Sequence, residues 1–398
     1  MRTTTNQAWA LTLAVILLGS MESREATAWQ VSRDTIRLSE RPEWGSGLRV
    51  VEELRVGELE GAPEYTFGAI DALAVRSDGG FYVYDRQAVT IREYDGRGRH
   101  VRLIGRRGAG PGEYAQVLGL AVSGSRLLVW DLGNARVTVF DSIGRYITSY
   151  RVTAGVWDLR GFTVDGAGQG YVKVARLGRR QSGEAGQWPR ALVKFSARGI
   201  IVDTIPLPAF EDPETPLIIE RPEGNRLPFQ EVPFATVLRD GRVVRAWNRS
   251  YQLEILGGPV LVRRVPATAL LREERAQWEA WTNYLRMEEA KRNIRHTFPM
   301  LPATKPYFRD LWVDDANRIW IDRYVTATKR NTTGKPGQPA YDWVEPVTFD
   351  LIDPAGRYLA TLELPPVRPL AARGWQIWGI RRGELGEEYV VRLRIVSG

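Results

Sequence analysis

A short apolar strand, a tight turn and a second strand recur along the chain, and this repeat constrains the fold more than any other feature. Five copies read LAVRSDGGFYVYD (73–85), LAVSGSRLLVWD (120–131), FTVDGAGQGYVKV (162–174), TVLRDGRVVRAW (236–247) and LWVDDANRIWID (311–322). Asp-Gly, Ser-Gly or Asp-Asp-Ala-Asn stands between the β-forming runs, as a tight hairpin requires. Each copy therefore predicts a β-hairpin.

A second hairpin follows the first in IREYDGRGRHVRLI, VTVFDSIGRYITSY, LVKFSARGIIVDTI and TFDLIDPAGRYLATL. In each, an Asp or Ser precedes a turn glycine, which suits a position of positive φ; these glycines are Gly98, Gly144, Gly199 and Gly356. Two hairpins make a four-stranded antiparallel sheet. Asp85 and Asp131 are 46 residues apart, a spacing typical of a propeller blade.

The copies predict six blades, so we expect an all-β, six-bladed β-propeller. The blades start near Asp71, Leu118, Arg160, Pro233 and Arg309, with a sixth near Trp375 that ends after about two strands. Two N-terminal segments, TIRLSE (35–40) and GLRVVEELRVG (47–57), are strands without partners. We expect both to complete the last blade and close the ring, which removes exposed sheet edges.

The stretch IGRRGAGPGEYAQVLGLAVSGSRLLVWDLGNARVTVFDSIGRYI (104–147) resembles an NHL repeat. It has the Gly-rich linker ending in Gly-Pro-Gly-Glu-aromatic, the strand ending in Asp131, and the Asn134-x-Arg136 step into the next strand. The whole chain is similar to exported bacterial six-bladed propellers of the NHL and TolB-like type. That resemblance implies a binding scaffold.

The linker LIGRRGAGPGEY (103–114) has the composition of a phosphate-binding loop but lacks its spacing. Counted from Gly108 and Gly110, the third glycine of a dinucleotide motif is replaced by Glu113, and no Gly-Lys-Ser/Thr follows. A strand follows it in place of a helix. We interpret it as the crossover from the outer strand of blade one to the inner strand of blade two.

The N-terminus is typical of an export signal. Arg2 precedes the apolar run AWALTLAVILLG (8–19), which is too short to span a bilayer, and Ala26-Thr27-Ala28 offers a cleavage site. An uncleaved anchor is the alternative. We expect residues 1–28 to be a signal peptide, residues 29–398 to be the propeller, and the protein to be secreted or periplasmic, without a membrane span after cleavage, and monomeric.

Composition excludes several kinds of site. The chain has no cysteine, which excludes thiol nucleophiles and thiolate metal centres. Its net charge is +8, but arginines are spread along the whole sequence, so we expect no nucleic-acid partner. Its two histidines, His100 and His296, are placed far apart by the repeats. A multi-histidine metal site or a catalytic triad is therefore not expected, unlike in the lyases among NHL-like propellers.

Three segments depart from the repeats: a helical segment, a polar loop and the Pro-rich stretch EDPETPLIIERPEGNRLPFQEVP (211–233). TALLREERAQWEAWTNYLRMEEAKRNIRHTF (268–298) predicts a helix between blades four and five, with Leu271, Trp278, Trp281 and Leu285 on one face. We expect this face to pack on the propeller rim; a lid or partner-docking role is the alternative. The loop KRNTTGKPGQPAYDW (329–343) is a polar insertion in blade five.

The central channel is the predicted ligand site. Its candidates are the charged and aromatic residues near the starts of the inner strands: Asp71, Asp158, Arg160, Arg309, Asp310 and Trp375. They could instead be ion pairs lining a wet tunnel. We interpret Asp85 and Asp131 as acceptors for backbone amides, with a calcium or magnesium site as the alternative.

The resemblance to exported propellers implies a binding scaffold, so we expect a non-catalytic module that binds a protein, peptide or glycan of the cell envelope, with no cofactor. The alternative is a divalent-metal-dependent hydrolase or lyase acting in the channel. A third hypothesis is that the protein binds a polyanion. It predicts that the protein is retained on heparin and that retention decreases steeply as the salt concentration rises.

Overall fold

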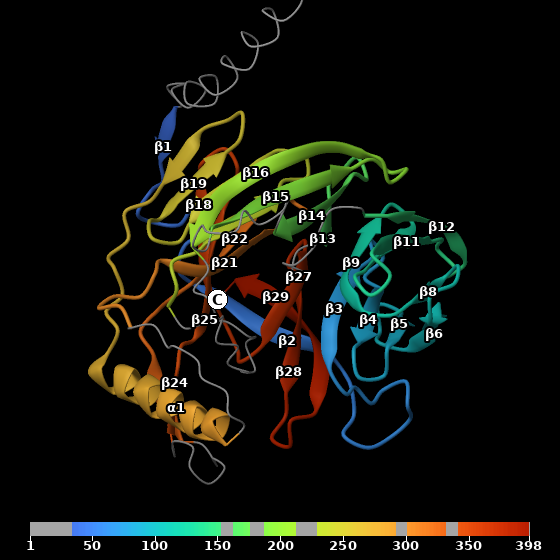
Figure 1. Ribbon diagram of the computed structural model, residues 1–398. Coiled ribbons are helices and arrows are strands. Elements are labelled where there is room, and N and C mark those ends of the chain that lie inside the picture. Colours follow the sequence, from blue (N-terminus) through green and yellow to red (C-terminus); the bar gives the residue numbers. More distant parts are fainter. Residues whose placement is uncertain are drawn as a thin grey trace, which may run out of the picture.

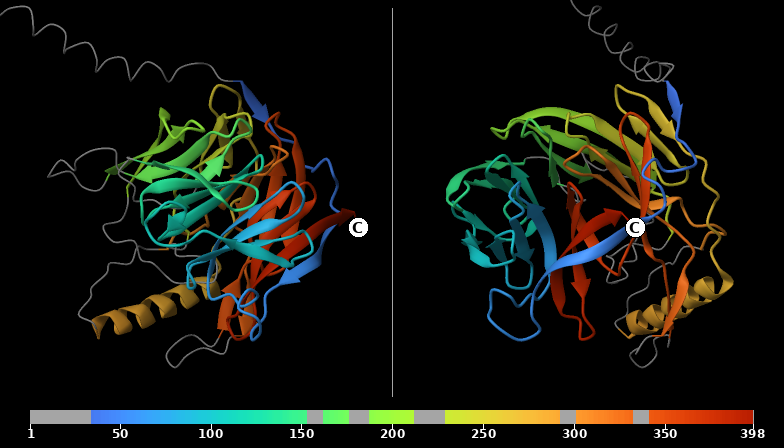
Figure 2. Two further views of the ribbon diagram at one scale, coloured as in Figure 1. Left: turned by 90° about the vertical axis from the view of Figure 1, so that its right-hand side faces the viewer. Right: turned by 180° about the vertical axis from the view of Figure 1, so that it is seen from behind.

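Six antiparallel blades lie around a central axis, and the protein is a six-bladed β-propeller (Figure 1). The computed structural model describes residues 34–152, 162–175, 187–211, 229–291, 301–331 and 341–397. The predicted fold class is confirmed, including the single helix inserted between blades four and five. Figure 2 shows the ring from two further sides.

Each blade runs from an inner strand at the axis to an outer strand at the rim. Blade one consists of β3 (Ile70–Val75), β4 (Phe81–Asp85), β5 (Thr90–Tyr94) and β6 (His100–Ile104). Blade two consists of β9 (Val117–Ser123), β10 (Arg126–Asp131), β11 (Arg136–Phe140) and β12 (Tyr146–Arg151). Blade three consists of β13 (Phe162–Val164), β14 (Gly170–Ala175), β15 (Gln187–Phe195) and β16 (Ile201–Glu211).

The last three blades carry the insertions and the chain ends. Blade four consists of β17 (Pro233–Val237), β18 (Val243–Trp247), β19 (Gln252–Ile255), β20 (Val260–Val262) and, at its edge, β1 (Thr35–Arg37). Blade five consists of β21 (Phe308–Val313), β22 (Ile319–Arg323), β25 (Val347–Ile352) and β26 (Tyr358–Leu364). Blade six consists of β27 (Arg368–Arg373), β28 (Gln376–Arg382), β29 (Glu388–Ser397) and β2 (Leu48–Val56).

Only one of the two N-terminal strands closes the ring as predicted. β2 pairs antiparallel with β29 and is the outer strand of blade six. The expectation that 35–40 also joins this blade is wrong, because β1 pairs in parallel with β20 of blade four. The sixth blade is also longer than predicted, since the carboxyl-terminal chain supplies three of its strands.

A packing requirement explains the position of β1. In blade one, Ile104 at the end of the outer strand lies against the turn glycine of the next blade: a Cβ on Gly144 would lie 2.5 Å from Ile104 Cδ1. The outer strand of blade four, β20, has only three residues. Ile36 of β1 takes the corresponding place, and a Cβ on Gly356 would lie 2.6 Å from Ile36 Cγ2. β1 therefore extends a short blade and fills its contact with blade five.

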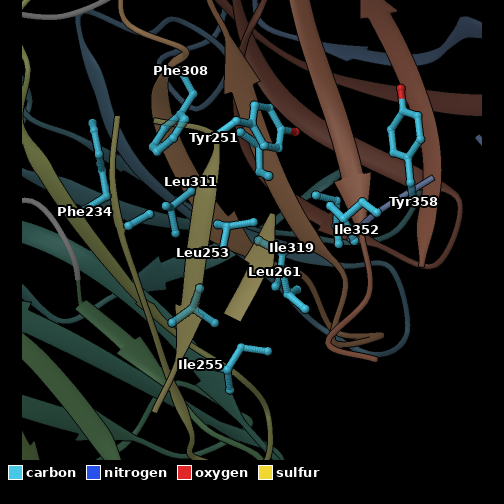
Figure 3. Packing of buried hydrophobic residues seen from close by; sticks show 14 of the residues in the cluster. Phe234, Tyr251, Leu253, Ile255, Leu261, Phe308, Leu311, Ile319, Ile352 and Tyr358 are labelled. Carbon is cyan, nitrogen blue, oxygen red and sulfur yellow. The ribbon is translucent and has the colours of Figure 1, made fainter. Parts of the chain in front are cut away.

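The core is divided among the interfaces between blades. Each neighbouring pair of blades has its own buried cluster, including the pair formed by blades six and one. Figure 3 shows the cluster between blades four and five, where Phe234 and Leu253 face Phe308 and Ile352. Middle strands with apolar residues on both faces produce this arrangement, as in β4, where every residue is buried, because every blade is covered on two sides.

The Gly-rich linker is a crossover between blades, as predicted. It carries two short parallel strands, β7 (Arg106–Arg107) and β8 (Glu113–Tyr114), and leads from β6 into β9. Glu113 accepts a hydrogen bond from the Gly110 amide (2.8 Å) and pairs with Arg106 (2.7 Å). Its own carboxylate thus occupies the place that a phosphate would take in a nucleotide loop.

Helix α1 (Arg272–Ala290) begins and ends inside the predicted segment 268–298. It lies beside a hairpin of β23 (Thr328–Asn331) and β24 (Tyr341–Val344), which is inserted between β22 and β25 (Figure 1). No helix in the described ranges has the length and hydrophobicity needed to cross a bilayer.

Candidate functional site

A central cavity of about 2730 Å³ extends along the propeller axis and is lined by residues from both ends of the inner strands. The end at which the inner strands begin also receives α1 and the β23–β24 hairpin. We call this end the helix-side mouth. It contains most of the described residues that the sequence indicated as ligand-binding.

β-Bulges direct the first residues of three inner strands. The pairing of β3 with β4 skips Asp71, that of β9 with β10 skips Leu118, and that of β21 with β22 skips Arg309. A bulge turns the unpaired residue away from the regular alternation of the strand. All three residues line the cavity, so the repeats correctly aligned them as equivalent positions.

Asp71 forms an ion pair with Arg86, which directly follows β4; their closest N and O atoms are 2.8 Å apart. Both side chains are exposed, at 38% and 59%, so water screens the pair. The ion pair therefore contributes little to the stability of the fold. Either side chain can leave it and bind a ligand.

Arg309 is held more firmly. Its Nη2 lies 2.5 Å from Glu345 Oε2 and donates to the backbone carbonyl of Arg323 at 2.8 Å. Its Nε lies 3.3 Å from Asp322, and its guanidinium carbon lies 4.5 Å from the centre of the Tyr324 ring. These contacts fix a partly exposed guanidinium group beside an aromatic face. Asp310, the next residue, also lines the cavity.

A buried cation joins this group to the helix. Lys305 is completely buried, and its Nζ lies 3.0 Å from Glu345 and 2.7 Å from Glu274 on α1. It also donates to the carbonyl of Val325 at 2.9 Å. Burial raises the pKa of the Glu274 carboxyl above its usual value, and the bond from Lys305 opposes this shift. A continuous chain of charges therefore runs from α1 to Arg309.

The first half of α1 packs on the propeller, as predicted. Trp278 is buried, and its ring meets Phe229 edge-on with centroids 5.9 Å apart. Gln277 accepts a hydrogen bond from the Trp343 amide at 2.6 Å. Of the other predicted members of the stripe, Leu271 is partly buried just before the helix begins, and the side chains of Trp281 and Leu285 lie outside the described residues. The docking face also contains buried polar groups, which the stripe did not predict.

Trp375 is not where the sequence placed it. Blade six begins at Arg368, and Trp375 lies in the turn between β27 and β28, at the opposite end of the channel. There its ring lies 4.8 Å from that of Trp44 and remains 49% exposed. Arg373-Gly374 is the first hairpin turn of this blade, and Gly374 has a φ of 58°. That glycine was the sequence signal that would have set the correct start.

Several residues of the mouth were not predicted. Arg368 donates to the carbonyl of Ile70 at 2.5 Å, and Glu388 accepts from the Ile70 amide at 2.6 Å, so blade six contacts blade one here. Lys305 and Glu345 lie in the irregular parts of blade five, where no repeat aligned them. Asp158 and Arg160, two of the predicted candidates, lie outside the described residues.

Asp85 and Asp131 are structural acceptors, as interpreted from the sequence. Asp131 is fully buried and accepts hydrogen bonds from the amides of Ala115 and Gln116 and from the Asn134 side chain. Asp85 accepts from the amides of Gly68 and Ala69, which precede the inner strand of its blade, and from those of Gln87 and Ala88 in the turn after β4. These bonds tie the second strand of each blade to the segment that enters the inner strand.

The charge of the cavity is mixed. Among the described residues that line it are ten Lys or Arg and twelve Asp or Glu side chains. No group of three or more His, Cys, Asp or Glu residues in the described part of the chain could hold a metal ion. The arrangement offers paired donors and acceptors beside aromatic rings, which suits a polar ligand with both kinds of group.

The comparisons with known proteins concern the fold. A Bacteroides fragilis protein described as exported has a TM-score of 0.47 at 10% identity, over 91% of this chain and 99% of that one. A member of the DUF4221 family from Bacteroides vulgatus has a TM-score of 0.45 at 11% identity, over 89% and 99%. Virginiamycin B lyase from Staphylococcus aureus has a TM-score of 0.39 at 12% identity, over 88% and 100%. No family model matches the sequence, and no curated protein matches it.

Proposed function

We propose that the protein is an exported, non-catalytic binding module that takes a protein segment, peptide or glycan of the cell envelope at the helix-side mouth. The observation that carries this proposal is the fixed guanidinium group of Arg309, which faces the cavity between Glu345 and the Tyr324 ring. Proteins use such groups to orient a polar ligand, because a guanidinium fork and an aromatic face need little reorganisation on binding.

The balance of charge supports a ligand with donors and acceptors over a polyanion. Acidic side chains slightly outnumber basic ones along the cavity, although the whole chain carries +8. A polyanion would meet no net positive charge at the mouth, because Arg86 is paired with Asp71 and Arg309 with Glu345. The Asp71–Arg86 pair and the Arg309 group present both signs within one opening.

A binding screen with two defined probe sets tests the proposal. The purified protein is screened against an array of cell-wall glycan fragments and against a displayed peptide library, and the best probe is titrated by calorimetry. Arg309→Ala should weaken binding by about tenfold or more, since it removes a charged hydrogen-bond donor. Arg264→Ala, at an exposed position on blade four, is the matched control and should leave the affinity unchanged.

The enzymatic alternative is tested on the same preparation. Elemental analysis measures bound metal, and thermal melts with and without added calcium measure its effect on stability. Tight, stoichiometric metal with a rise in Tm would contradict the binding-module proposal and favour a metal-dependent hydrolase or lyase. Equal affinity of Arg309→Ala and wild type for the best probe would remove the mouth as the site.

A further inference from the structure

The outer strands of blades one to three, together with the turns that precede them, carry most of the large apolar side chains that the described surface exposes. Val101 and Leu103 lie on β6, Tyr146 and Ile147 on β12, and Ile201 and Val202 on β16. Ile143 and Ile200 lie in the turns before β12 and β16. Leu103 is 56% exposed and Ile200 is 63% exposed. Exposed apolar residues that gather in one region of a soluble protein mark a contact surface.

These segments form one continuous surface, which we call the rim patch (101–103, 143–147 and 198–202). Arg102 Nη1 donates to the carbonyl of Ile143 at 2.7 Å, which joins β6 to the turn before β12. The turn before β16 lies on β12, where a Cβ on Gly199 would collide with the Tyr150 ring. All three segments lie toward the right-hand side of Figure 1, the side that faces the viewer in the left panel of Figure 2.

The rim patch and its immediate borders are strongly basic. Between residues 97–107, 143–151 and 197–204, the exposed charged residues are a single acid, Asp203, and seven arginines: Arg97, Arg99, Arg106, Arg107, Arg145, Arg151 and Arg198. Only Arg99 and Arg106 of these seven form an ion pair within the described chain. The rest of the described surface is close to balance, with sixteen exposed basic and fifteen exposed acidic residues. The excess of positive charge on the described surface is therefore concentrated here.

Arginine and apolar side chains alternate within the patch. Arg145 immediately precedes Tyr146 and Ile147, and Arg198 lies two residues before Ile200. Protein interfaces also contain arginine, but they usually gather their apolar residues in a centre that is depleted of other charged residues and has a polar border. Surfaces that bind anionic lipid instead mix aliphatic side chains with arginine or lysine, because the aliphatic groups enter the acyl boundary while the cations stay with the phosphates.

We propose that the rim patch binds the surface of an anionic phospholipid membrane, with the disc of the propeller standing on the edge formed by blades one to three. The apolar side chains enter the headgroup region, and the unpaired arginines contact lipid phosphates. This orientation leaves both mouths of the channel open along the membrane surface. The contact is peripheral and independent of the ligand taken at the helix-side mouth.

Vesicle sedimentation with the full chain tests this inference. Vesicles of equal parts phosphatidylglycerol and phosphatidylcholine should carry the wild-type protein into the pellet, and vesicles of phosphatidylcholine alone should not. Binding should weaken as sodium chloride rises, because salt screens the attraction to the phosphates. The double variant Arg145→Glu/Arg198→Glu should bind at least about thirty-fold more weakly. Each arginine near an anionic membrane contributes about 1 kcal/mol to binding, and the variant loses two of them.

Two further variants separate the causes. Arg49→Glu/Arg264→Glu changes the net charge by the same amount at exposed positions outside the patch, and its affinity should stay within about twofold of wild type. Leu103→Ser/Ile200→Ser keeps the charge but should bind about tenfold more weakly, with the salt dependence unchanged. Both pairs are exposed, so thermal melts should match wild type.

The inference is overturned if the wild type does not sediment with the anionic vesicles, or if the two charge-reversed variants lose binding equally. Retention on immobilised poly-glutamate without vesicle binding would also overturn it and would assign the patch to an acidic protein partner. None of these results bears on the channel, which is tested separately by Arg309→Ala.

Discussion

Lys305 Nζ lies 2.7 Å from the carboxylate of Glu274, with both side chains almost completely buried. Glu274 belongs to the inserted helix and Lys305 to the segment that enters blade five. This pair, together with Glu345, connects the insertion to the residues that hold Arg309 at the channel. The helix is therefore part of the wall of the helix-side mouth, and its stability and the geometry of the mouth are coupled.

Replacing Lys305 with Met should lower the free energy of unfolding by about 3–5 kcal/mol, because Glu274 is then buried without its cation. Urea denaturation followed by tryptophan fluorescence measures the change. Lys329→Met, at an exposed position of β23, is the control and should change stability by about 0.5 kcal/mol or less. Equal effects of the two substitutions would show that the buried pair does not anchor the helix.

Glu274→Gln should have a pH-dependent effect. Burial raises the pKa of Glu274 above its usual value of 4.5, so the folded state disfavours the ionised carboxylate. In wild type, this residue therefore makes stability fall as the pH rises from about 4.5 through the folded pKa, and the fall then levels off. Thermal melts of both proteins across this range should show that the Tm of the variant increases relative to the Tm of wild type as the pH rises. A difference that is constant with pH would contradict the raised pKa.

Asp131→Ala should destabilise blade two by about 2–4 kcal/mol, since the amides of Ala115 and Gln116 and the Asn134 side chain lose the buried carboxylate that accepts their hydrogen bonds. Asp141→Ala, in a partly exposed turn, removes acceptors only from the amides of Ile143 and Arg145 and should cost about 1 kcal/mol. Chemical denaturation measures both. If Asp131 were instead a metal ligand, calcium would raise the Tm of wild type and not that of the variant.

Gly356→Ala should destabilise the contact between blades four and five more than an equivalent change elsewhere. Gly356 has a φ of 87°, and a Cβ there would lie 2.6 Å from Ile36 Cγ2. Gly257 has a φ of 75° and no atom near the position of a Cβ, so Gly257→Ala is a control for backbone strain alone. The control should cost about 1–2 kcal/mol, and the collision should add about 1–3 kcal/mol. Equal losses in thermal melts would show that β1 does not seal this contact.

The repeats identified the blades because each hairpin is a local structure. The alternation of apolar residues and the turn glycines Gly98, Gly144 and Gly356 set strand and turn within a few residues of one another, so they can be read directly from the chain. Even the bulged residues Asp71 and Arg309 were aligned correctly, because a bulge recurs at the same place in equivalent strands. The one misplaced blade start, at Trp375, came from overlooking a hairpin turn that contains a single glycine, Gly374.

The mouth of the channel was only partly predictable. Lys305, Glu345 and Arg368 come from different blades or irregular segments, and no spacing in the sequence relates them to Arg309. The pairing partner of β1 could not be predicted from the sequence either. It depends on the short length of β20 and on the contact of Ile36 with Gly356.

By itself, the sequence determined most of the blade strands, the number of blades and the closure by β2, because alternation and turn chemistry act between residues close together in the chain. It did not show that the ends of the 329–343 insertion pair as β23 and β24. Only the tertiary structure decided which charges meet at the mouth, where β1 pairs and which arginines share the rim with exposed aliphatic residues. These properties depend on contacts between blades, and such contacts are set by the curvature of the ring and the lengths of outer strands. Local sequence patterns determine neither the curvature of the ring nor the lengths of the outer strands.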